Sequence, residues 1–295
     1  LLKNIGYNGN NRLIMVNGKQ CYRSNNEGLI IEDAEGLESF QSWGWIFRGI
    51  VKNDTQQSIY LGIVEWDYTI WTYLPSIYKS TDGGESFTRI LELTSQNGFT
   101  VGTSHFDIWA APVHGGNVYV LNDGKCYILS PNDDLMFVGE FSPTESGSNI
   151  LIGGVDNEQV FLHCRIGSQL YSSDDGGNSW QAVGIKNVFP MTYPRGIMVQ
   201  PGKTNTIFVT IGDSTPGRNG AIMRSEDTGK TWQSMPLPVQ PNTAMWVVNI
   251  QPNDPQIVLA GSRYGYLYRS DDGGNTWEKL WREFSEISSV LWIPG

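Results

Sequence analysis

The stretch "RSDDGGNTW" at residues 269–277 has three close relatives in the same chain. These are "KSTDGGESF" at 79–87, "YSSDDGGNSW" at 171–180 and "RSEDTGKTW" at 224–232. All four fit the pattern Ser-x-Asp-x-Gly-x-Ser/Thr-Trp/Phe. Because Asp accepts local backbone hydrogen bonds and Gly adopts positive φ, each copy predicts a tight turn between two antiparallel strands. We expect the aromatic residue to pack beneath the turn, and the alternative is that these acidic turns bind a metal or a substrate.

Two weaker copies of the pattern extend the series. They are "CYRSNNEG" at 21–28 and "CYILSPNDD" at 126–134. The six serines of the series then follow one another at spacings of 56, 50, 43, 52 and 45 residues. A period of roughly 45 residues is typical of the blades of a β-propeller. Six copies in 295 residues leave no room for a seventh unit.

The units predict the fold class. Each contains four short apolar segments, so we expect an all-β, six-bladed β-propeller with four-stranded antiparallel blades, forming a single domain over residues 1–295. The first unit has only three such segments, at 12–18, 20–25 and 29–36, while an extra segment, 287–295, follows the sixth. Because closure removes exposed sheet edges, we expect the N- and C-terminal strands to pair in one blade.

The composition limits the partners. A formal net charge of −10 argues against nucleic-acid and anionic-membrane partners, and no apolar run approaches the length of a membrane span. Three cysteines at irregular spacing predict no disulfides and no zinc site. The chain starts without a Met or a signal-peptide pattern, as a trimmed mature form would, so secreted, periplasmic and cytoplasmic locations all stay open. A small-molecule or glycan ligand is the partner that we expect.

The repeated segments resemble the Asp-box, or BNR, repeat, and the resemblance covers most of the chain. It implies a β-propeller in which these turns join the third and fourth strand of each blade. It also implies that the ligand site lies on the opposite face, formed by loops that are rich in aromatic residues and arginine. We expect the substrate-binding residues there to be Trp45, Trp66, Trp71, Tyr193, Trp246 and Tyr264, together with Arg48, Arg165, Arg195 and Arg263.

Guanidinium groups gathered around one pocket would bind a carboxylate or another oxyanion. The alternatives are that each arginine only pairs with a loop carboxylate and that several rings only pack loop against blade. A one-residue shift in strand register would also turn Arg48 or Arg195 away.

Proton-transfer candidates occur in the same loops: Glu65 and Asp67 in "EWDY", and His105 and Asp107 in "SHFD". A carboxylate among aromatic rings can have its pKa raised, as a general acid requires. A metal held by His105, His163 and a carboxylate is conceivable, but the spacing matches no known ligand pattern. We therefore predict no metal and no other cofactor, and expect each histidine to be structural or acid–base in role.

Among six-bladed Asp-box propellers the chain is most similar to sialidases. Phe47-Arg48-Gly49-Ile50 resembles their F/Y-R-I-P motif without its proline, and Asp67 could be their acid/base. The resemblance also implies a Tyr nucleophile, such as Tyr264 or Tyr266, paired with a Glu. No glutamate occurs between Glu158 and Glu226, so a true sialidase is not expected.

Three hypotheses follow from these residues. The first is an enzyme, a hydrolase or lyase, that acts on a glycan or another small oxygenated substrate by acid–base chemistry. The second is a non-catalytic carbohydrate-binding or assembly-factor propeller. The third is an enzyme on an aromatic or terpenoid small molecule. Loops of very different lengths favour one asymmetric pocket and hence the first hypothesis.

Overall fold

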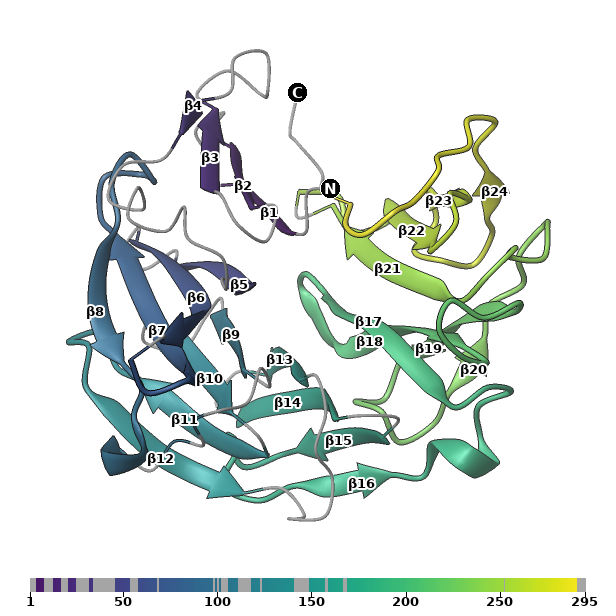
Figure 1. Cartoon of the computed structure of the whole chain (residues 1–295). Coiled ribbons are helices and arrows are strands. Elements are labelled where there is room, and N and C mark those ends of the chain that lie inside the picture. Colours follow the sequence, from purple (N-terminus) through teal and green to yellow (C-terminus); the bar gives the residue numbers. More distant parts are fainter. Residues whose placement is uncertain are drawn as a thin grey trace. The chain divides into compact units, whose positions relative to one another are not determined.

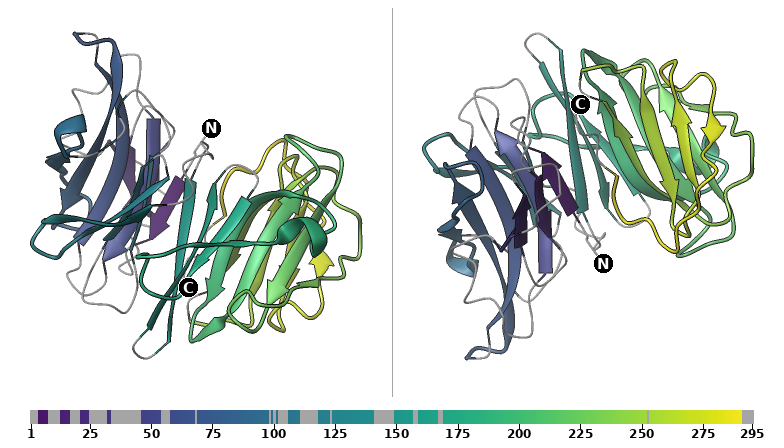
Figure 2. Two further views of the ribbon diagram at one scale, coloured as in Figure 1. Left: turned by 90° about the horizontal axis from the view of Figure 1, so that it is seen from below. Right: turned by 90° about the horizontal axis from the view of Figure 1, so that it is seen from above.

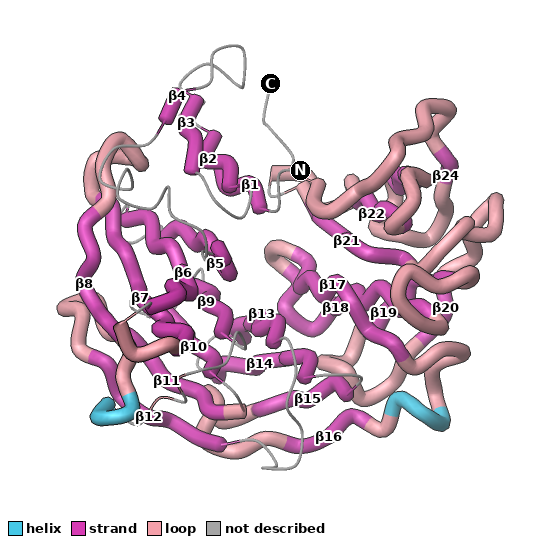
Figure 3. Tube along the Cα trace, viewed as in Figure 1, coloured by secondary structure: helices cyan, strands magenta, loops and turns pink. Residues whose placement is uncertain are grey.

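The computed structural model describes residues 4–7, 13–16, 21–24, 32–33, 46–53, 58–67, 69–97, 99, 101, 106–110, 118–122, 124–140, 149–156, 159–166, 169–251 and 253–290. In this part of the chain the regular structure is antiparallel strand, apart from short 3-10 turns at Ser95–Asn97 and Ile185–Asn187 (Figure 3). The strands form six four-stranded sheets, each built from four consecutive strands (Figure 1). The all-β prediction is therefore confirmed.

The chain divides into two compact units, and the first comprises Leu1–Leu151 with Gly295. It holds three sheets. The first sheet consists of β1 (Asn4–Tyr7), β2 (Leu13–Val16), β3 (Cys21–Ser24) and β4 (Glu32–Asp33). The second consists of β5 (Ile46–Asn53), β6 (Ser58–Asp67), β7 (Thr72–Ser80) and β8 (Thr88–Glu92). The third consists of β9 (Phe106–Ala110), β10 (Val118–Asn122), β11 (Lys125–Leu129) and β12 (Leu135–Glu140).

The second unit comprises Ile152–Pro294. The fourth sheet, whose first strand starts just before this boundary, consists of β13 (Asn149–Asp156), β14 (Gln159–Ile166), β15 (Gln169–Ser173) and β16 (Gln181–Val183). The fifth consists of β17 (Tyr193–Gln200), β18 (Lys203–Gly212), β19 (Gly220–Ser225) and β20 (Gln233–Ser234). The sixth consists of β21 (Met245–Ile250), β22 (Val258–Ser262), β23 (Leu267–Ser270) and β24 (Glu278–Lys279).

Neighbouring sheets within a unit pack face to face, as the fifth and sixth do in Figure 2. The core between these two contains Phe208, Val248, Tyr268 and Trp277, all buried. The equivalent core of the first unit includes Tyr60, Phe106 and Tyr127. Alternate apolar side chains on each strand supply these layers, because successive residues of a strand point to opposite faces.

The first sheet differs from the prediction. Its four strands all come from residues 4–33, and the innermost, β1, was not expected because its sequence, "NIGY", has no clear apolar alternation. The C-terminal strand expected at 287–295 is not seen at 287–290, and 291–295 lies outside the described residues. The fourth strand of this sheet thus comes from the N-terminal segment, and the pairing of the two termini stays a prediction.

The four strong copies of the repeat form turns with one shared set of hydrogen bonds, and we call them the Ser-Asp turns (80–87, 173–180, 225–232 and 270–277). In the last of them Ser270 Oγ donates to Asp272 Oδ1 (2.8 Å) and accepts from Gly274 N (2.8 Å). Asp272 also accepts from Thr276 N (2.8 Å) and Thr276 Oγ1 (2.6 Å). The same bonds recur in the other three turns. The carboxylate therefore satisfies backbone and hydroxyl donors of its own turn.

The aromatic residue closes each turn from below, as the sequence predicts. Trp277 is buried and its indole Nε1 donates to Gly274 O at 2.9 Å. Trp180 and Trp232 make the same bond at 2.9 Å, while Phe87 is buried without one. Each turn thus joins the third strand of its sheet to the fourth through contacts that are local in sequence.

Acid is expected to weaken the fold through two of these turns. Hydrogen bonds from Thr276 lower the pKa of Asp272 to about 2. Burial acts to raise the pKa of Asp82, but hydrogen bonds from Ser80 and Ser86 outweigh it and the pKa is about 2. An unfolded Asp titrates near pH 3.9, so both carboxylates stabilise the fold above about pH 4, and this stabilisation is lost as the pH falls toward 2.

The check is urea unfolding at a series of pH values for the wild type and the Asp82→Asn, Asp272→Asn double variant. The free energy of unfolding of the wild type should fall faster between pH 4 and pH 2 than that of the variant. Parallel slopes for the two proteins would rule out these carboxylates as the source of the acid sensitivity.

Candidate ligand site in the second unit

The residue pairs between neighbouring strands distinguish the two ends of a sheet. In the fifth sheet Ser225, which starts a Ser-Asp turn, pairs with Ile207, whereas Tyr193 and Gly220 both pair with Gly212 at the other end. The sixth sheet repeats this arrangement, with Ser270 at one end and Met245 at the other. We call the end away from the Ser-Asp turns the loop end. It is where the sequence predicted the binding residues of these sheets.

Arg195 lies in a β-bulge near the start of β17. The ladder to β18 passes from Pro194 directly to Ile197, so Arg195 and Gly196 have no ladder partner. The hydroxyl of Thr210 accepts from Gly196 N at 2.7 Å and replaces the lost ladder bond. A Cβ on Gly196 would lie only 2.9 Å from that hydroxyl oxygen. The bulge therefore requires glycine and redirects the neighbouring arginine.

The same irregularity occurs at two other inner strands. The β5 ladder shifts between Phe47 and Gly49, around Arg48, and the β21 ladder shifts between Met245 and Val247, around Trp246. A simple one-residue register shift was the alternative considered from the sequence. The structure has local bulges at these positions and no shift of the whole strand. The alternation of apolar residues does not predict such bulges.

The bulges of β17 and β21 bring two arginines to one indole ring. The guanidinium carbon of Arg195 lies 3.6 Å from the ring centroid of Trp246, and that of Arg263 lies 4.5 Å from it. Arg195 Nη1 also donates to the Tyr193 hydroxyl at 3.1 Å. Four of the predicted substrate-binding residues (Arg195, Arg263, Tyr193 and Trp246) therefore form one cluster, which we call the arginine–tryptophan cluster.

The two arginines differ in their charge balance. Arg263 forms an ion pair with Glu286. Arg195 has no acidic partner among the described side chains, and its Nε is buried without a hydrogen bond. Burial lowers the pKa of Arg195, and the positive charge of Arg263 lowers it further, against the opposing effect of Tyr193. A partly desolvated guanidinium without a counterion is a strong attractor for an anion.

Glu286 is the residue of this cluster that the sequence analysis missed. It follows Arg263 by 23 residues and lies just before the segment 287–295 that was expected to be a strand. The backbone positions this segment: Ile287 N donates to Arg263 O at 3.1 Å, and Phe284 N donates to Gly265 O at 3.1 Å. No local sequence pattern predicts this contact, because it depends on the path by which the chain after β24 comes back to Arg263 and Gly265.

A second aromatic group lies at the loop end of the second sheet, in the first unit. Trp66 makes edge contacts with Tyr73 (4.7 Å between centroids) and with Trp71 (6.4 Å). "EWDYTIWTYLPS" was expected to be a loop, but β6 and β7 continue into it as far as the pair Asp67 and Thr72. Aromatic cross-strand pairs stabilise such an extension. Trp71 stays 75% exposed at the tip.

The other predicted site residues are placed less fully. Glu65, Asp67, Arg48, Asp107 and Arg165 lie in strands, near the loop ends of their sheets. Their side chains, and the whole of Trp45 and His105, lie outside the described residues. Tyr264 follows Arg263 and is 49% exposed. The acid–base roles of Glu65, Asp67, His105 and Asp107 therefore stay predictions.

Neither a metal-binding group of side chains nor a membrane-spanning helix occurs among the described residues. No group of three or more His, Cys, Asp or Glu side chains that could hold a metal ion occurs among them. None of the helices described there has the length and apolar character needed to cross a membrane.

Solved structures resemble the whole of this chain. It superposes on the GH74 enzyme of Niastella koreensis with a TM-score of 0.67 at 16% identity, over 94% of this chain and 45% of that one. It superposes on YCF48 from Cyanidioschyzon merolae with a TM-score of 0.65 at 16% identity, over 95% of this chain and 85% of that one. The chain is a β-propeller.

Two further comparisons concern this propeller. The family model described as "Sortilin, neurotensin receptor 3" matches residues 168–292. The structure of YCF48 bound to D1 peptide gives a TM-score of 0.62 at 13% identity, over 94% of this chain and 81% of that one. No curated protein sequence matched the chain. The chain spans less than half the length of the GH74 enzyme that it resembles.

Proposed function

We propose that this propeller binds a glycan that carries a carboxylate, and that the arginine–tryptophan cluster is the centre of the site. The observation that carries the proposal is the buried Nε of Arg195, which has no partner among the described residues. The Nε edge of a guanidinium binds a carboxylate through two parallel hydrogen bonds. Trp246 stacks on Arg195 and Arg263, and Tyr264, the residue after Arg263, is half-exposed and offers an aromatic surface of the kind that lines ligand sites.

The proposal extends to chemistry on the bound glycan. Pairing a uronic-acid carboxylate with Arg195 would stabilise the negative charge that develops when the adjacent proton is removed. Hydrolysis would instead need a carboxylic acid to protonate the leaving oxygen. The proton-transfer candidates predicted from the sequence, Asp67, Glu65, Asp107 and His105, belong to the first unit, so we do not assign them to this cluster. The GH74 enzyme shows that a similar fold supports catalysis.

The test compares matched sugars. Titration calorimetry with oligogalacturonate should show saturable binding, and methyl esterification, which removes the charge and adds a methyl group, should weaken it by at least about 10-fold. Sialylated and glucuronate oligosaccharides extend the panel, each beside its neutral counterpart. Equal affinity for acid and ester would contradict the proposal.

The catalytic extension is tested separately by product analysis. Product that forms from the acidic sugar at a rate that saturates with its concentration would support the enzyme hypothesis. Binding without product identifies a non-catalytic glycan-binding propeller, so the two parts of the proposal fail independently.

A second candidate is peptide binding. It is favoured by the YCF48–D1 peptide complex, because the present chain covers 81% of that protein but only 45% of the GH74 enzyme. A peptide carboxylate would satisfy Arg195 in the same way as a sugar acid. Tighter binding of acidic peptides than of acidic sugars in the same titration would favour this candidate.

We also propose that the six sheets are the blades of one six-bladed propeller over residues 1–295, with the Ser-Asp turns as its Asp-box repeats. Six consecutive four-stranded sheets support the count.

A further inference from the structure

Two junctions between neighbouring sheets, second to third and fifth to sixth, use a long basic side chain at the Ser-Asp end. The residue just before the turn serine reaches the turn of the next sheet. In the first unit Lys79 Nζ donates to both carboxylate oxygens of Asp133, in the β11–β12 turn, at 2.9 and 3.0 Å. In the second unit Arg224 Nη1 donates to Gly273 O (3.0 Å) and Asn275 Oδ1 (2.8 Å), in the β23–β24 turn. These side chains fill the space between the turns.

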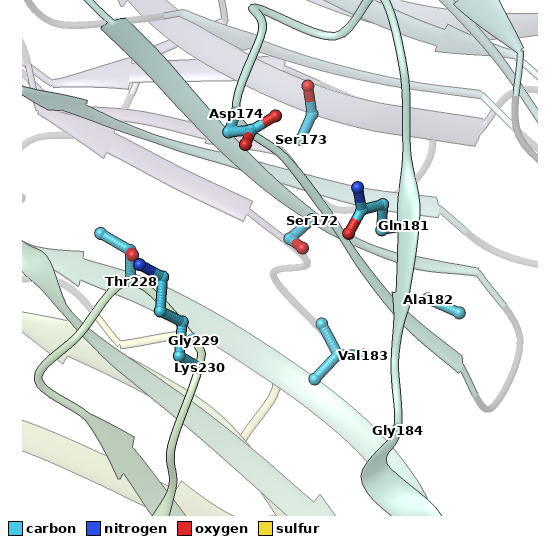
Figure 4. Close-up of a pocket in the computed structure, with 10 residues that line it drawn as sticks. All are labelled: Ser172, Ser173, Asp174, Gln181, Ala182, Val183, Gly184, Thr228, Gly229 and Lys230. Carbon is cyan, nitrogen blue, oxygen red and sulfur yellow. The ribbon is translucent and has the colours of Figure 1, made fainter.

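The junction between the fourth and fifth sheets has a serine at this position. Ser172 is the residue before the turn serine Ser173, and its side chain is too short to reach the β19–β20 turn. A cavity of about 490 Å³ lies between that turn and the β15–β16 hairpin (Figure 4). We call it the junction cavity. Its volume is in the range of ordinary small-molecule sites.

The polar side chains around the junction cavity carry opposite charges on its two walls. Asp174 and Gln181 come from the β15–β16 hairpin, and Lys230 comes from the β19–β20 turn (Figure 4). None of these three side chains makes a hydrogen bond or ion pair with another described residue. Lys230 occupies the turn position that Asn275 holds in the sixth sheet, where the amide oxygen accepts from Arg224.

We propose that the junction cavity binds a small ligand with a guanidinium or ammonium group at one end and a carboxylate at the other. This is the chemistry of a basic amino acid, or of an arginine or lysine at the C-terminus of a peptide. The cationic end lies beside Asp174, which holds the turn position that Glu226 has next to Arg224 (Nη2 to Oε1, 3.7 Å). The carboxylate end pairs with Lys230, and Gln181 supplies a further hydrogen bond.

The experiment uses N-acetyl-L-arginine as the probe in titration calorimetry with the full chain. N-acetyl-L-arginine amide lacks the carboxylate, and N-acetyl-L-citrulline lacks the cation. Each should bind at least about 10-fold more weakly than the probe, because each loses one charge-assisted contact. Ser172→Arg should abolish binding by filling the cavity as Arg224 does, while Ser172→Ala, the matched control, should keep it.

Two exposed substitutions assign the ends of the ligand and do not depend on how Ser172→Arg folds. Asp174→Asn should remove the preference for arginine over citrulline, and Lys230→Gln should remove the preference for acid over amide. No saturable binding of N-acetyl-L-arginine, binding that survives Ser172→Arg in a folded protein, or preferences unchanged in both exposed variants would overturn the proposal.

Free L-arginine and a short peptide ending in arginine then identify the source of the ligand. Tighter binding of the free amino acid indicates a metabolite, and tighter binding of the peptide indicates a protein C-terminus. Either order supports the site.

Discussion

Gly274→Ala is expected to lower the free energy of unfolding by about 3 kcal/mol, from about 1 kcal/mol of left-handed backbone strain and about 2 kcal/mol of overpacking. Gly274 has φ +88°, and a Cβ there would lie 2.7 Å from Cε1 of Phe208, which is fully buried. The same glycine donates its N–H to Ser270 and accepts the indole N–H of Trp277. A shift that relieves the clash therefore disturbs the whole turn.

Gly176→Ala is the matched control. Gly176 also has positive φ (+72°), but a Cβ there would meet nothing within 4 Å. It should lose only the backbone contribution, about 1 kcal/mol. Equilibrium urea unfolding followed by tryptophan fluorescence measures both variants. Equal losses would show that the packing of the turn against Phe208 contributes little.

Arg195→Gln is expected to weaken binding of the acidic ligand by about 100-fold, the value of roughly two charge-assisted hydrogen bonds. Arg195→Lys should restore little of this, because an ammonium cannot present the two parallel N–H groups of a guanidinium. Calorimetry with the tightest acidic sugar or peptide measures the effect. Arg269→Ala is the control, because Arg269 lies at the Ser-Asp end, away from the arginine–tryptophan cluster, and forms an ion pair with Asp271.

Stability separates a binding role of Arg195 from a structural one. Its Nε is buried without a hydrogen-bond partner, and burial lowers its pKa. Burying this charge therefore costs stability. Arg195→Gln loses the stack on Trp246 and the bond to Tyr193, but it also removes the cost of burying an unpaired charge, so its unfolding temperature should stay close to that of the wild type. A lower unfolding temperature together with unchanged affinity would assign Arg195 to the fold and refute its role in binding.

Part of the site follows directly from residue types. Tyr193, Arg195, Trp246 and Arg263 could be chosen from the sequence because they flank inner strands, away from the repeated turns. Their mutual contacts could not be chosen, because these depend on bulges in β17 and β21. The ion pair between Glu286 and Arg263 could not be predicted for the same reason, because a contact between distant segments leaves no periodic pattern in the sequence.

The repeated Ser-Asp turns were determined by the sequence alone, because every hydrogen bond that defines them joins residues within seven positions of one another. The alternation of apolar residues in the segments between the turns likewise determined the four strands of the second to sixth sheets. Only the tertiary structure decided which cations are left without partners. Arg263 forms an ion pair with Glu286, and Arg224 donates to the turn of the next sheet. Arg195 contacts only neutral groups, the Trp246 ring and the Tyr193 hydroxyl, among the described side chains. Charge balance depends on distances between strands that are far apart in the chain, and it is this balance that points to an anionic ligand.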